Sequence, residues 1–196
     1  MKVIQFNLSS VNNMGKILVI SGHPDYKKSI ANRAIINEFR SLVPDAEIVY
    51  LDSEYPDFNI DVKREQKRLA QADTVVLEFP FWWYSAPSLM RRYLEQVMTY
   101  GFAFGPTGKA LTGKRLIVSF TTGAAAEAYS PQGYQHYTIE QFMPQFRALS
   151  NLCGFEWQEP IYSCGMTLAN PDDKEAANVF YNKVADHARR LADAVG

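Results

Sequence analysis

Short runs of apolar residues alternate along the chain with segments in which apolar residues recur every three or four positions. Continuous apolar runs are typical of strands that are buried on both faces of a sheet. These runs lie at residues 16–20, 47–51, 74–79, 115–121 and 155–162. The segments with helical spacing lie at residues 29–42, 61–71, 87–98, 139–149 and 170–194. The pattern therefore predicts five strands and five helices in alternation.

Signals at the ends of two later segments support the predicted helices. Thr138 and Gln141 have the spacing of a capping box, in which each side chain bonds the backbone of the other residue. Pro144 follows within the same segment and is expected to kink the helix. Asn170 is a good capping residue, and Pro171 suits the first helical position after it.

Alternating strands and helices predict an α/β fold with a doubly wound, five-stranded parallel sheet and helices on both faces. Ligands of such sheets bind beyond the carboxyl ends of the strands, close to the point where the strand order reverses. The loops at residues 21–28, 80–86 and 121–137 are therefore the best candidates for a functional site. The loop at residues 51–60 is a weaker candidate.

Composition excludes several classes of protein. The chain has 196 residues, of which 47% are apolar, with 20 basic and 21 acidic side chains. Such a composition is incompatible with a disordered chain. A nucleic-acid-binding protein usually has a basic excess, which is absent here. No apolar run approaches the roughly 20 residues that span a bilayer, so we expect no nucleic-acid partner and no membrane span.

The N-terminal segment differs from the remainder of the chain. Residues 1–15 are polar, rich in Asn and Ser, and lack the apolar core of a secretory signal. We interpret them as an extension outside a single domain at residues 16–196. Cys153 and Cys164 have no CxxC spacing and are too few for a disulfide framework. Reduced thiols and a cytoplasmic location are therefore expected.

The loop after the first strand, at residues 21–28, has features of a phosphate site. It leads to Ser29 at the start of a predicted helix, where free backbone N–H groups and the helix dipole favour an anion. Lys27, Lys28 and the Ser29 hydroxyl would add to that site. The alternative is an ordinary turn in which Ser29 caps the helix and His23 is a loop histidine. The GxGxxG pattern of dinucleotide-binding proteins is absent.

The loop after the third strand is unusually aromatic. Five of the six positions at residues 79–84 are aromatic. Large aromatic side chains at the end of a strand are suited to stacking on a flat heterocycle. The alternatives are a core position or an oligomer interface, and the latter is compatible with ring binding. Nine aromatic residues fall within residues 79–104, and we expect Phe81–Tyr84 and Phe102–Phe104 to form the walls of a flat-ligand site.

The loop after the fourth strand could supply polar contacts and protons. It begins Thr121-Thr122-Gly123-Ala124 and continues to Tyr129 and His136. Backbone N–H groups beside Gly123 could approach the polar edge of a ring closely. Tyr129 and His136 are residue types that exchange protons in enzymes. The alternative is a surface loop without a chemical role.

Other catalytic motifs are absent from the sequence. The segment GKALTGK at residues 108–114 resembles a P-loop, but Arg115 stands where Ser or Thr is needed. It also precedes a strand, whereas a P-loop follows one. There is no HExxH, GxSxG or Cys/His cluster, so no metal site is expected.

Taken together, the three loops resemble those of the flavodoxin-like NAD(P)H:quinone oxidoreductases, a family that includes the DT-diaphorases. The resemblance extends in order from about residue 16 to 190. It is greatest to the bacterial branch that is ancillary to glutathione-regulated potassium-efflux systems. The segments that carry it are GHPDYKKSIAN (22–32), YPDFNID (55–61), FPFWWYSAPSLMRRYLEQV (79–97), YGFAFG (100–105), LTGKRL (111–116), TTGAAAEAYSPQGY (121–134) and NLCGF (151–155).

The resemblance implies a bound flavin and a two-electron, ping-pong transfer of hydride from NADPH or NADH to quinones. The resemblance to the bacterial branch favours FMN, and the sequence shows no separate site for an adenine group. FAD is the alternative. The resemblance also implies a homodimer with sites at the subunit interface. By position, the phosphate-binding residues would be His23, Ser29, Ile30, Ala31 and Asn32. The residues at the ring would be Phe81, Trp82, Trp83, Tyr84, Thr121, Thr122, Gly123 and Ala124.

The sequence departs from the family pattern at two places in the third loop. Ala124 stands where the family often has a second glycine, and its methyl group could crowd the ring. Tyr129 occupies the position of a tyrosine that stabilises the reduced flavin in mammalian members. The histidine that pairs with it would fall on Gln135, whereas His136 lies one residue later. Tyr129 and His136 are the candidate catalytic residues.

Two other functions remain open from the sequence. The branch resemblance indicates a regulatory subunit of a potassium-efflux transporter, which would place the protein at the inner face of the membrane. An electron-carrier flavodoxin is the other alternative. The net charge of -1 disfavours it, because such carriers are usually strongly acidic.

Overall fold

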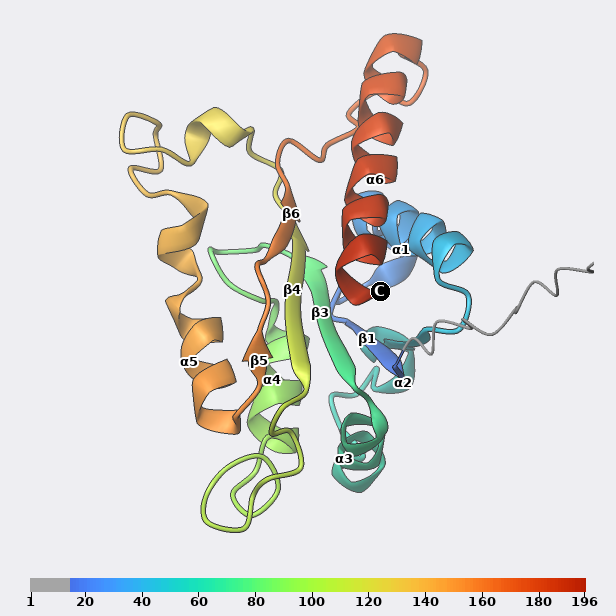
Figure 1. The fold of residues 1–196 in the computed structure, drawn as a ribbon. Coiled ribbons are helices and arrows are strands. Elements are labelled where there is room, and N and C mark those ends of the chain that lie inside the picture. The colour runs from blue at the N-terminus through green and yellow to red at the C-terminus, as the bar shows by residue number, and fades with distance from the viewer. Residues whose placement is uncertain (1–14) are drawn as a thin grey trace, which may run out of the picture.

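A computed structural model describes residues 15–196, which form a twisted parallel sheet between two layers of helices (Figure 1). The strand order is β2-β1-β3-β4-β5, and β6 pairs with β4 further along the same edge. The chain therefore leaves β1 toward one edge and returns to the other side of β1 with β3. This is the flavodoxin-like order, with its reversal between β1 and β3. The predicted fold class is confirmed.

Four of the five predicted strands are confirmed within one residue. They are β1 (Ile17–Ser21), β2 (Glu47–Tyr50), β3 (Thr74–Pro80) and β4 (Arg115–Thr121). Residues that pair across neighbouring strands include Ser21 with Glu78, and Glu78 with Ser119. Paired residues of parallel strands point to the same face of the sheet, so these three polar side chains share one face.

The fifth predicted strand is wrong as a single element. Residues 155–162 form two short strands, β5 (Glu156–Trp157) and β6 (Ile161–Ser163), which pair with the beginning and the end of β4. Pro160 stands between them and has no N–H to donate to the ladder. The strand therefore leaves the sheet for three residues and rejoins it.

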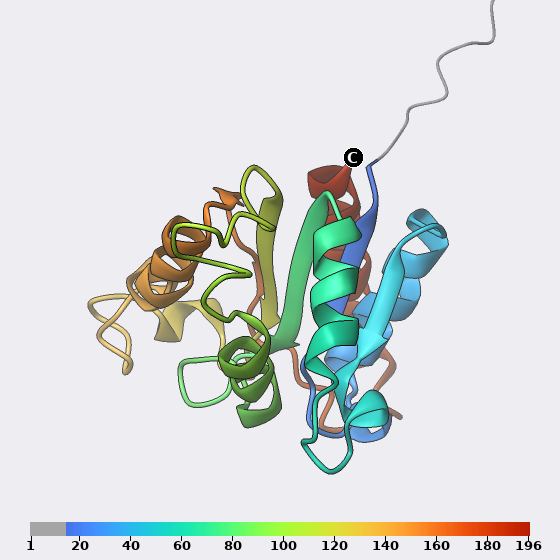
Figure 2. The same cartoon turned by 90° about the horizontal axis from the view of Figure 1, so that it is seen from below.

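Helices cover both faces of the sheet, as the view from below shows (Figure 2). One face packs against α1 (Ala31–Leu42) and α6 (Lys174–Val195). The other face packs against α3 (Val62–Gln71), α4 (Ser88–Val97) and α5 (Pro144–Cys153), with a single-turn helix α2 (Leu51–Glu54) beside them.

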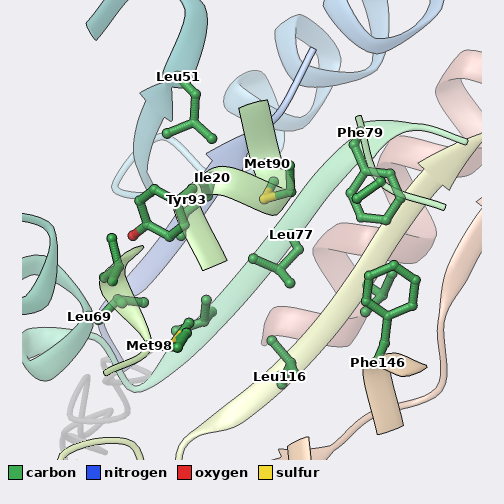
Figure 3. Packing of buried hydrophobic residues seen from close by; sticks show 14 of the residues in the cluster. Ile20, Leu51, Leu69, Leu77, Phe79, Met90, Tyr93, Met98, Leu116 and Phe146 are labelled. Atoms are coloured by element: carbon green, nitrogen blue, oxygen red, sulfur yellow. The ribbon is translucent and has the colours of Figure 1, made fainter. Parts of the chain in front are cut away.

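The two faces of the sheet bury alternate residues of each strand. In β1, Ile17 and Val19 pack with the α1 and α6 layer, whereas Leu18 and Ile20 face the opposite layer. Figure 3 shows the larger core, in which side chains from α3, α4 and α5 meet on β3 and β4. A core on each face holds the strands rigidly, so the loops at their carboxyl ends have fixed bases.

Two helix starts differ from the predictions. The segment after Thr138 does have the capping box with Gln141, but it is a short 3-10 helix, Ile139–Phe142, and α5 begins separately. Pro144 occupies the first turn of α5, because its ring would clash with the preceding turn of a continuous helix. The predicted kinked helix is thus two helices.

The last helix begins later than predicted. Asn170 forms a local turn, in which its side-chain oxygen accepts the Asp172 N–H, and Pro171 lies in that turn. The cap is Asp173, whose Oδ1 accepts the N–H groups of Glu175 and Ala176, both at 3.1 Å. Satisfying two N–H groups with one carboxylate makes Asp173 the better cap.

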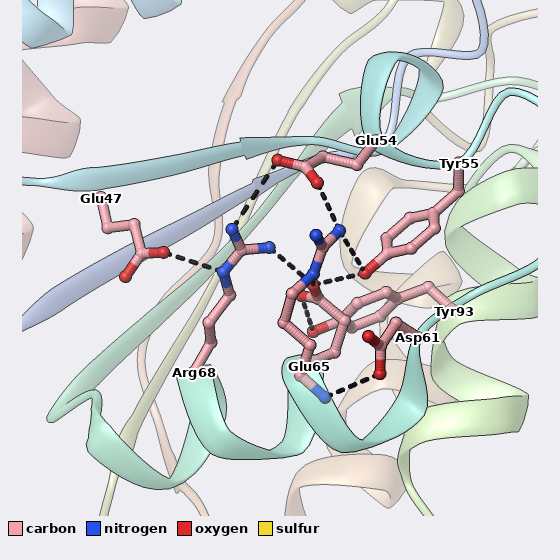
Figure 4. Close-up of polar contacts among 8 residues, drawn as sticks. Glu47, Glu54, Tyr55, Asp61, Glu65, Arg68 and Tyr93 are labelled. Atoms are coloured by element: carbon pink, nitrogen blue, oxygen red, sulfur yellow. Dashed lines mark hydrogen bonds and ion pairs between the residues drawn. The ribbon is translucent and has the colours of Figure 1, made fainter.

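A buried polar cluster holds α3 to its neighbours (Figure 4). The Glu65 carboxylate is fully buried and accepts hydrogen bonds from the Tyr55 hydroxyl at 2.6 Å and from Arg68 at 2.6 Å. The Tyr93 hydroxyl of α4 donates to it at 3.4 Å. Arg68 also pairs with Glu47 of β2 at 2.9 Å. One carboxylate therefore connects α3, α4 and the edge of the sheet.

The expected N-terminal extension at residues 1–15 falls, except for Gly15, outside the described residues. Among the helices of residues 15–196, none has the length and apolar character required to cross a membrane.

Candidate functional site

The three candidate loops converge at the carboxyl edge of the sheet, at the upper end of β3 and β4 in Figure 1. A pocket of about 390 Å³ opens there, a volume within the range of small-molecule sites. It lies where the strand order reverses. Its lining residues are His23, Lys28, Ser29, Ile30, Ala31, Asn32, Pro80, Trp82, Thr121, Thr122, Gly123, Met166, Thr167, Leu168 and Ala169.

The first loop gives one end of this pocket the character of an anion site. A 3-10 helix (Tyr26–Lys28) precedes Ser29, which is buried and accepts the Arg33 N–H at 3.3 Å. Ile30 occupies the N-cap position of α1 and makes no side-chain capping bond. The Ser29 hydroxyl therefore occupies the Arg33 N–H, and the N–H groups of Ile30, Ala31 and Asn32 are left for a ligand.

A chain of buried hydrogen bonds lies beneath that end. The Asn32 amide donates to the Glu78 carboxyl, and the Ser21 hydroxyl donates to the same carboxyl at 3.4 Å. The Thr121 hydroxyl donates to the Asn32 side-chain oxygen at 3.3 Å. Burial raises the pKa of Glu78 to about 8. Asn32 and Thr121 line the pocket, so this chain links the pocket floor to the interior of the sheet.

His23 forms part of the pocket wall in its neutral form. Its Nδ1 accepts the Asp25 N–H at 3.1 Å, and its ring meets Trp82 edge-on with centroids 5.4 Å apart. Burial lowers the pKa of His23, an effect that the carboxylates of Asp52 and Asp25 oppose. Near neutral pH the imidazole therefore presents Nε2–H as a donor.

The aromatic side chains of residues 81–84 lie in different environments. Phe81 is buried against Phe120 and belongs to the core rather than to the pocket. Trp82 lines the pocket and is half exposed. Trp83 is 92% exposed, and Tyr84 stacks on Phe142 with ring centroids 5.3 Å apart.

Trp83 and Tyr84 occupy an unfavourable backbone conformation. Their φ angles are +50° and +62°, and Ser85 N–H donates to the Trp82 carbonyl at 3.1 Å. Positive φ at both central positions of a two-residue hairpin is a type I′ turn, which prefers Asn-Gly. Left-handed backbone at two bulky residues is costly, and such strain concentrates at functional sites.

In the third loop, Thr121, Thr122 and Gly123 line the pocket, whereas Ala124 does not. The Ala124 carbonyl accepts the Thr122 hydroxyl at 2.7 Å and the Gly165 N–H at 2.7 Å. A Cβ at Gly123 would meet only the Thr167 methyl, at 3.6 Å. Space alone therefore does not require glycine at position 123.

Tyr129 and His136 lie outside the pocket of a single chain. Tyr129 is partly buried and meets Phe142 edge-on at 6.4 Å between centroids. Burial raises the pKa of its hydroxyl, and the Thr122 side chain partly offsets this. His136 is exposed, with φ +59° and Nδ1 3.4 Å from the Pro131 carbonyl oxygen.

The segment 102–104 lies at the opposite end of the sheet from the aromatic loop. It packs on the core beyond the end of α4, and α4 is ten residues, or about 15 Å, long. Within one chain, Phe81–Tyr84 and Phe102–Phe104 therefore form no common wall.

The lining residues that the sequence did not indicate follow β6. Met166 N–H donates to the Thr122 carbonyl at 2.8 Å, which ties residues 166–169 to the third loop. These residues follow the carboxyl end of a strand. Because ligands of parallel sheets bind at that edge, this position in the sequence was the one signal that could have predicted their place in the pocket. Among residues 15–196, no group of His, Cys, Asp and Glu side chains is arranged to hold a metal ion.

The arrangement suits a ligand with a flat ring and an anionic end. The N–H groups of residues 30–32 at the start of α1 would receive the anion, and Trp82 with His23 would face the ring. The pocket is therefore of a form that fits a flavin mononucleotide.

Comparison with known proteins gave consistent results. The family model of the flavodoxin-like fold matches residues 15–188. General stress protein 14 of Bacillus subtilis is 37% identical over 91% of this chain and 95% of that protein. Ancillary protein KefG of a glutathione-regulated potassium-efflux system, from Pectobacterium carotovorum, is 34% identical over 80% of this chain and 85% of its own length.

Two further relatives bear on chemistry. An NAD(P)H oxidoreductase of Bacillus subtilis, YrkL, is 32% identical over 83% of this chain and 93% of that protein. The crystal structure of general stress protein 14 from Treponema denticola, in complex with FMN, superposes with a TM-score of 0.83 at 26% identity. It covers 92% of this chain and 99% of that one.

Proposed function

The chain belongs to the flavodoxin-like NAD(P)H:quinone oxidoreductase family, and from this premise we propose that it reduces quinones with NADPH or NADH through bound FMN. The observation on which the proposal rests is the pocket at the strand-order reversal, with the start of α1 at one end. FMN in the related structure from Treponema denticola supports the choice of cofactor over FAD.

Different residues of the pocket would bind the phosphate and the ring system of FMN. Ser29 and the first-turn N–H groups of Ile30, Ala31 and Asn32 would bind the phosphate. Trp82 and the backbone of residues 121–123 would face the ring system. When bound, a flavin accepts hydride from a nicotinamide and delivers two electrons to a second substrate.

Tyr129 and His136 remain our candidates for proton exchange with the substrates. The Tyr129 hydroxyl, whose pKa burial raises, would act as a neutral hydrogen-bond donor. His136 would need a rearrangement of its exposed loop, or a neighbouring subunit, to reach the pocket.

We further propose a cytoplasmic homodimer whose sites lie at the subunit interface. The exposed Trp83 and the distance between Phe81–Tyr84 and Phe102–Phe104 favour it, because a second copy could bring the two segments together. Analytical ultracentrifugation of the FMN-loaded protein should give a dimer. A monomer at micromolar concentration would contradict this part of the proposal.

The enzymatic proposal is tested by purifying the protein and recording its visible spectrum. After reconstitution with FMN, the flavin absorbance should bleach on anaerobic addition of NADPH and return on addition of menadione. Denaturation should release FMN rather than FAD. The absence of bound flavin after reconstitution would contradict the proposal.

A second candidate function is suggested by the KefG relatives: regulation of a potassium-efflux transporter at the inner face of the membrane. The two functions can coexist in one protein. Co-purification with a transporter encoded beside it, and a change in potassium efflux on deletion, would support this role. Unchanged efflux in the deletion strain would contradict it.

Trp82 and Trp83 provide a matched pair of neighbours with different environments. Because Trp82 lines the pocket, Trp82→Ala should weaken FMN binding about tenfold, through lost aromatic contacts. Trp83 is 92% exposed in one chain and does not line the pocket, but the proposed dimer brings its loop to the interface, so Trp83→Ala should weaken FMN binding by a smaller factor than Trp82→Ala. Quenching of flavin fluorescence measures both. An effect of less than about twofold at Trp83 would contradict a site at the subunit interface.

A further inference from the structure

A carboxyl group lies buried directly behind the proposed phosphate site. Glu78, two residues before the end of β3, is fully buried and faces the layer of α1 and α6. Its Oε1 accepts from the Asn32 amide, and its Oε2 lies 3.4 Å from the Ser21 hydroxyl. Asn32 stands in the first turn of α1 and lines the pocket. One amide thus separates this carboxyl from the ligand.

No cation neutralises Glu78 among the residues that the structure describes, since none forms an ion pair with it. The titratable groups on the packed elements are Tyr26 from the 3-10 helix and His187 from α6. Burial raises the pKa of Tyr26 and lowers that of His187 to about 3. Both are therefore neutral near pH 7, and β4 contributes two uncharged groups, the hydroxyls of Ser119 and Thr121.

The two remaining charged or polar groups nearby have other partners. The Arg33 guanidinium of α1 donates to the Lys27 carbonyl at 2.8 Å. His23, in the loop after β1, accepts the Asp25 N–H, and burial lowers its pKa. Burying a charged carboxylate without a neighbouring cation costs much free energy, whereas burying a neutral carboxylic acid costs little.

We propose that Glu78 controls the affinity of the pocket for a phosphate group, which binds tightly while Glu78 carries its proton and weakly once that proton is lost. The inference rests on the proposed FMN site. It assigns Glu78 a positioning role, acting through Asn32, that distinguishes phosphorylated from unphosphorylated flavin.

Hydrogen bonding permits the protonated form without rearrangement. The Glu78 Oε2–H would donate to the Ser21 hydroxyl, which can accept as well as donate. Oε1 would continue to accept from Asn32, leaving the second N–H of that amide for the phosphate. Neither contact requires a charge on Glu78.

The direction of the pH dependence follows from linkage. Burial raises the pKa of Glu78 to about 8 against the opposing effect of the Asn32 and Ser21 hydrogen bonds, and a bound phosphate dianion would raise it further by repulsion. A group whose pKa rises on binding takes up protons, so affinity falls as pH rises through the pKa of the free protein. FMN affinity should therefore fall between pH 7 and pH 9. The second ionisation of phosphate lies near pH 6, below this window.

The experiment measures the dissociation constant of FMN by fluorescence quenching from pH 7 to pH 9. In the unmodified protein the dissociation constant should rise about fivefold over this range, because a one-unit rise in pKa on binding gives its full tenfold effect only above pH 9. Glu78→Gln mimics the neutral acid, with its amide donating to Ser21, and should bind FMN with an affinity independent of pH. Riboflavin, which lacks the phosphate, should show no comparable slope with either protein.

The matched control is Glu38→Gln, which removes one carboxylate from an exposed position of the same helix α1 and should leave the slope unchanged. A second measurement does not depend on any variant. Calorimetry in two buffers of different ionisation enthalpy should show uptake of about half a proton per FMN near pH 8.

Each outcome separates this inference from the proposed function. FMN binding with equal slopes in the unmodified protein and in Glu78→Gln, or equal slopes for riboflavin and FMN, would overturn the role of Glu78 alone. No proton uptake near pH 8 would do the same. Failure of FMN to bind at pH 7 would overturn the cofactor assignment and this inference with it.

Discussion

Glu65→Ala should reduce the free energy of unfolding by about 3–5 kcal/mol, the cost of breaking a buried charged cluster by removing one partner. The substitution would leave the Tyr55 and Tyr93 hydroxyls without their acceptor. It would also remove the buried carboxylate that Arg68 contacts at 2.6 Å. For a domain of this size, the melting temperature should fall by about 10 °C or more. Urea denaturation followed by circular dichroism measures the change.

The control is Glu54→Gln, because Glu54 pairs with Arg64 and Arg68 at the surface and should contribute less than about 1 kcal/mol. A triple variant tests the reason for the loss. Combining Glu65→Met with Tyr55→Phe and Tyr93→Phe removes both hydroxyl donors along with the acceptor, and Arg68 keeps its pairs with Glu47 and Glu54, so most of the lost stability should return. If Glu65→Ala costs no more than the control, the cluster is not what holds α3 in place.

Ile30→Asp should weaken FMN binding about 10- to 100-fold, since a carboxylate would stand at the start of α1 beside the phosphate. Ile30 is 49% exposed, so the fold should tolerate the change. An acidic residue at a helix start also interacts favourably with the helix dipole. Folding stability should therefore stay constant or rise slightly while cofactor affinity falls.

Ile30→Asn isolates the charge, because it has the same shape as the aspartate variant. It should bind FMN within about threefold of the unmodified protein. Raising the salt concentration should narrow the difference between the two variants, because the repulsion is partly exposed to solvent. Equal affinities for Ile30→Asp and Ile30→Asn at low salt would contradict a phosphate at this end of the pocket.

The fold was predictable because its strands are continuous apolar runs. A parallel sheet buries both of its faces, so its strands are apolar at nearly every position. A run such as residues 74–79 is therefore easily distinguished from the more polar segments around it. The predictions were wrong where a single residue determines how a strand or helix begins or ends. Pro160 interrupts a run that otherwise reads as one strand, and Asp173 forms a better cap than Asn170, three residues earlier. The spacing of apolar residues carries no information about such single-residue effects.

The site was predictable in position but not in the orientation of its side chains. The three loops meet at the strand-order reversal, as the alternation of elements implies. Phe81 and Trp82 are chemically alike, yet one packs into the core and the other lines the pocket. The turn that follows has Trp83 and Tyr84 at its centre, and neither residue type is typical of a tight turn. Glu78 was hidden within an apolar strand, where its burial depends on partners distant in sequence.

The left-handed turn at Trp83 and Tyr84 has a consequence for laboratory evolution. Asn-Gly at these two positions would relieve the backbone cost of the type I′ turn. A library selected for heat resistance alone should therefore lose the aromatic pair, while one selected for turnover should retain it if the pair serves binding. The residues that survive each selection would reveal what this turn contributes to fitness.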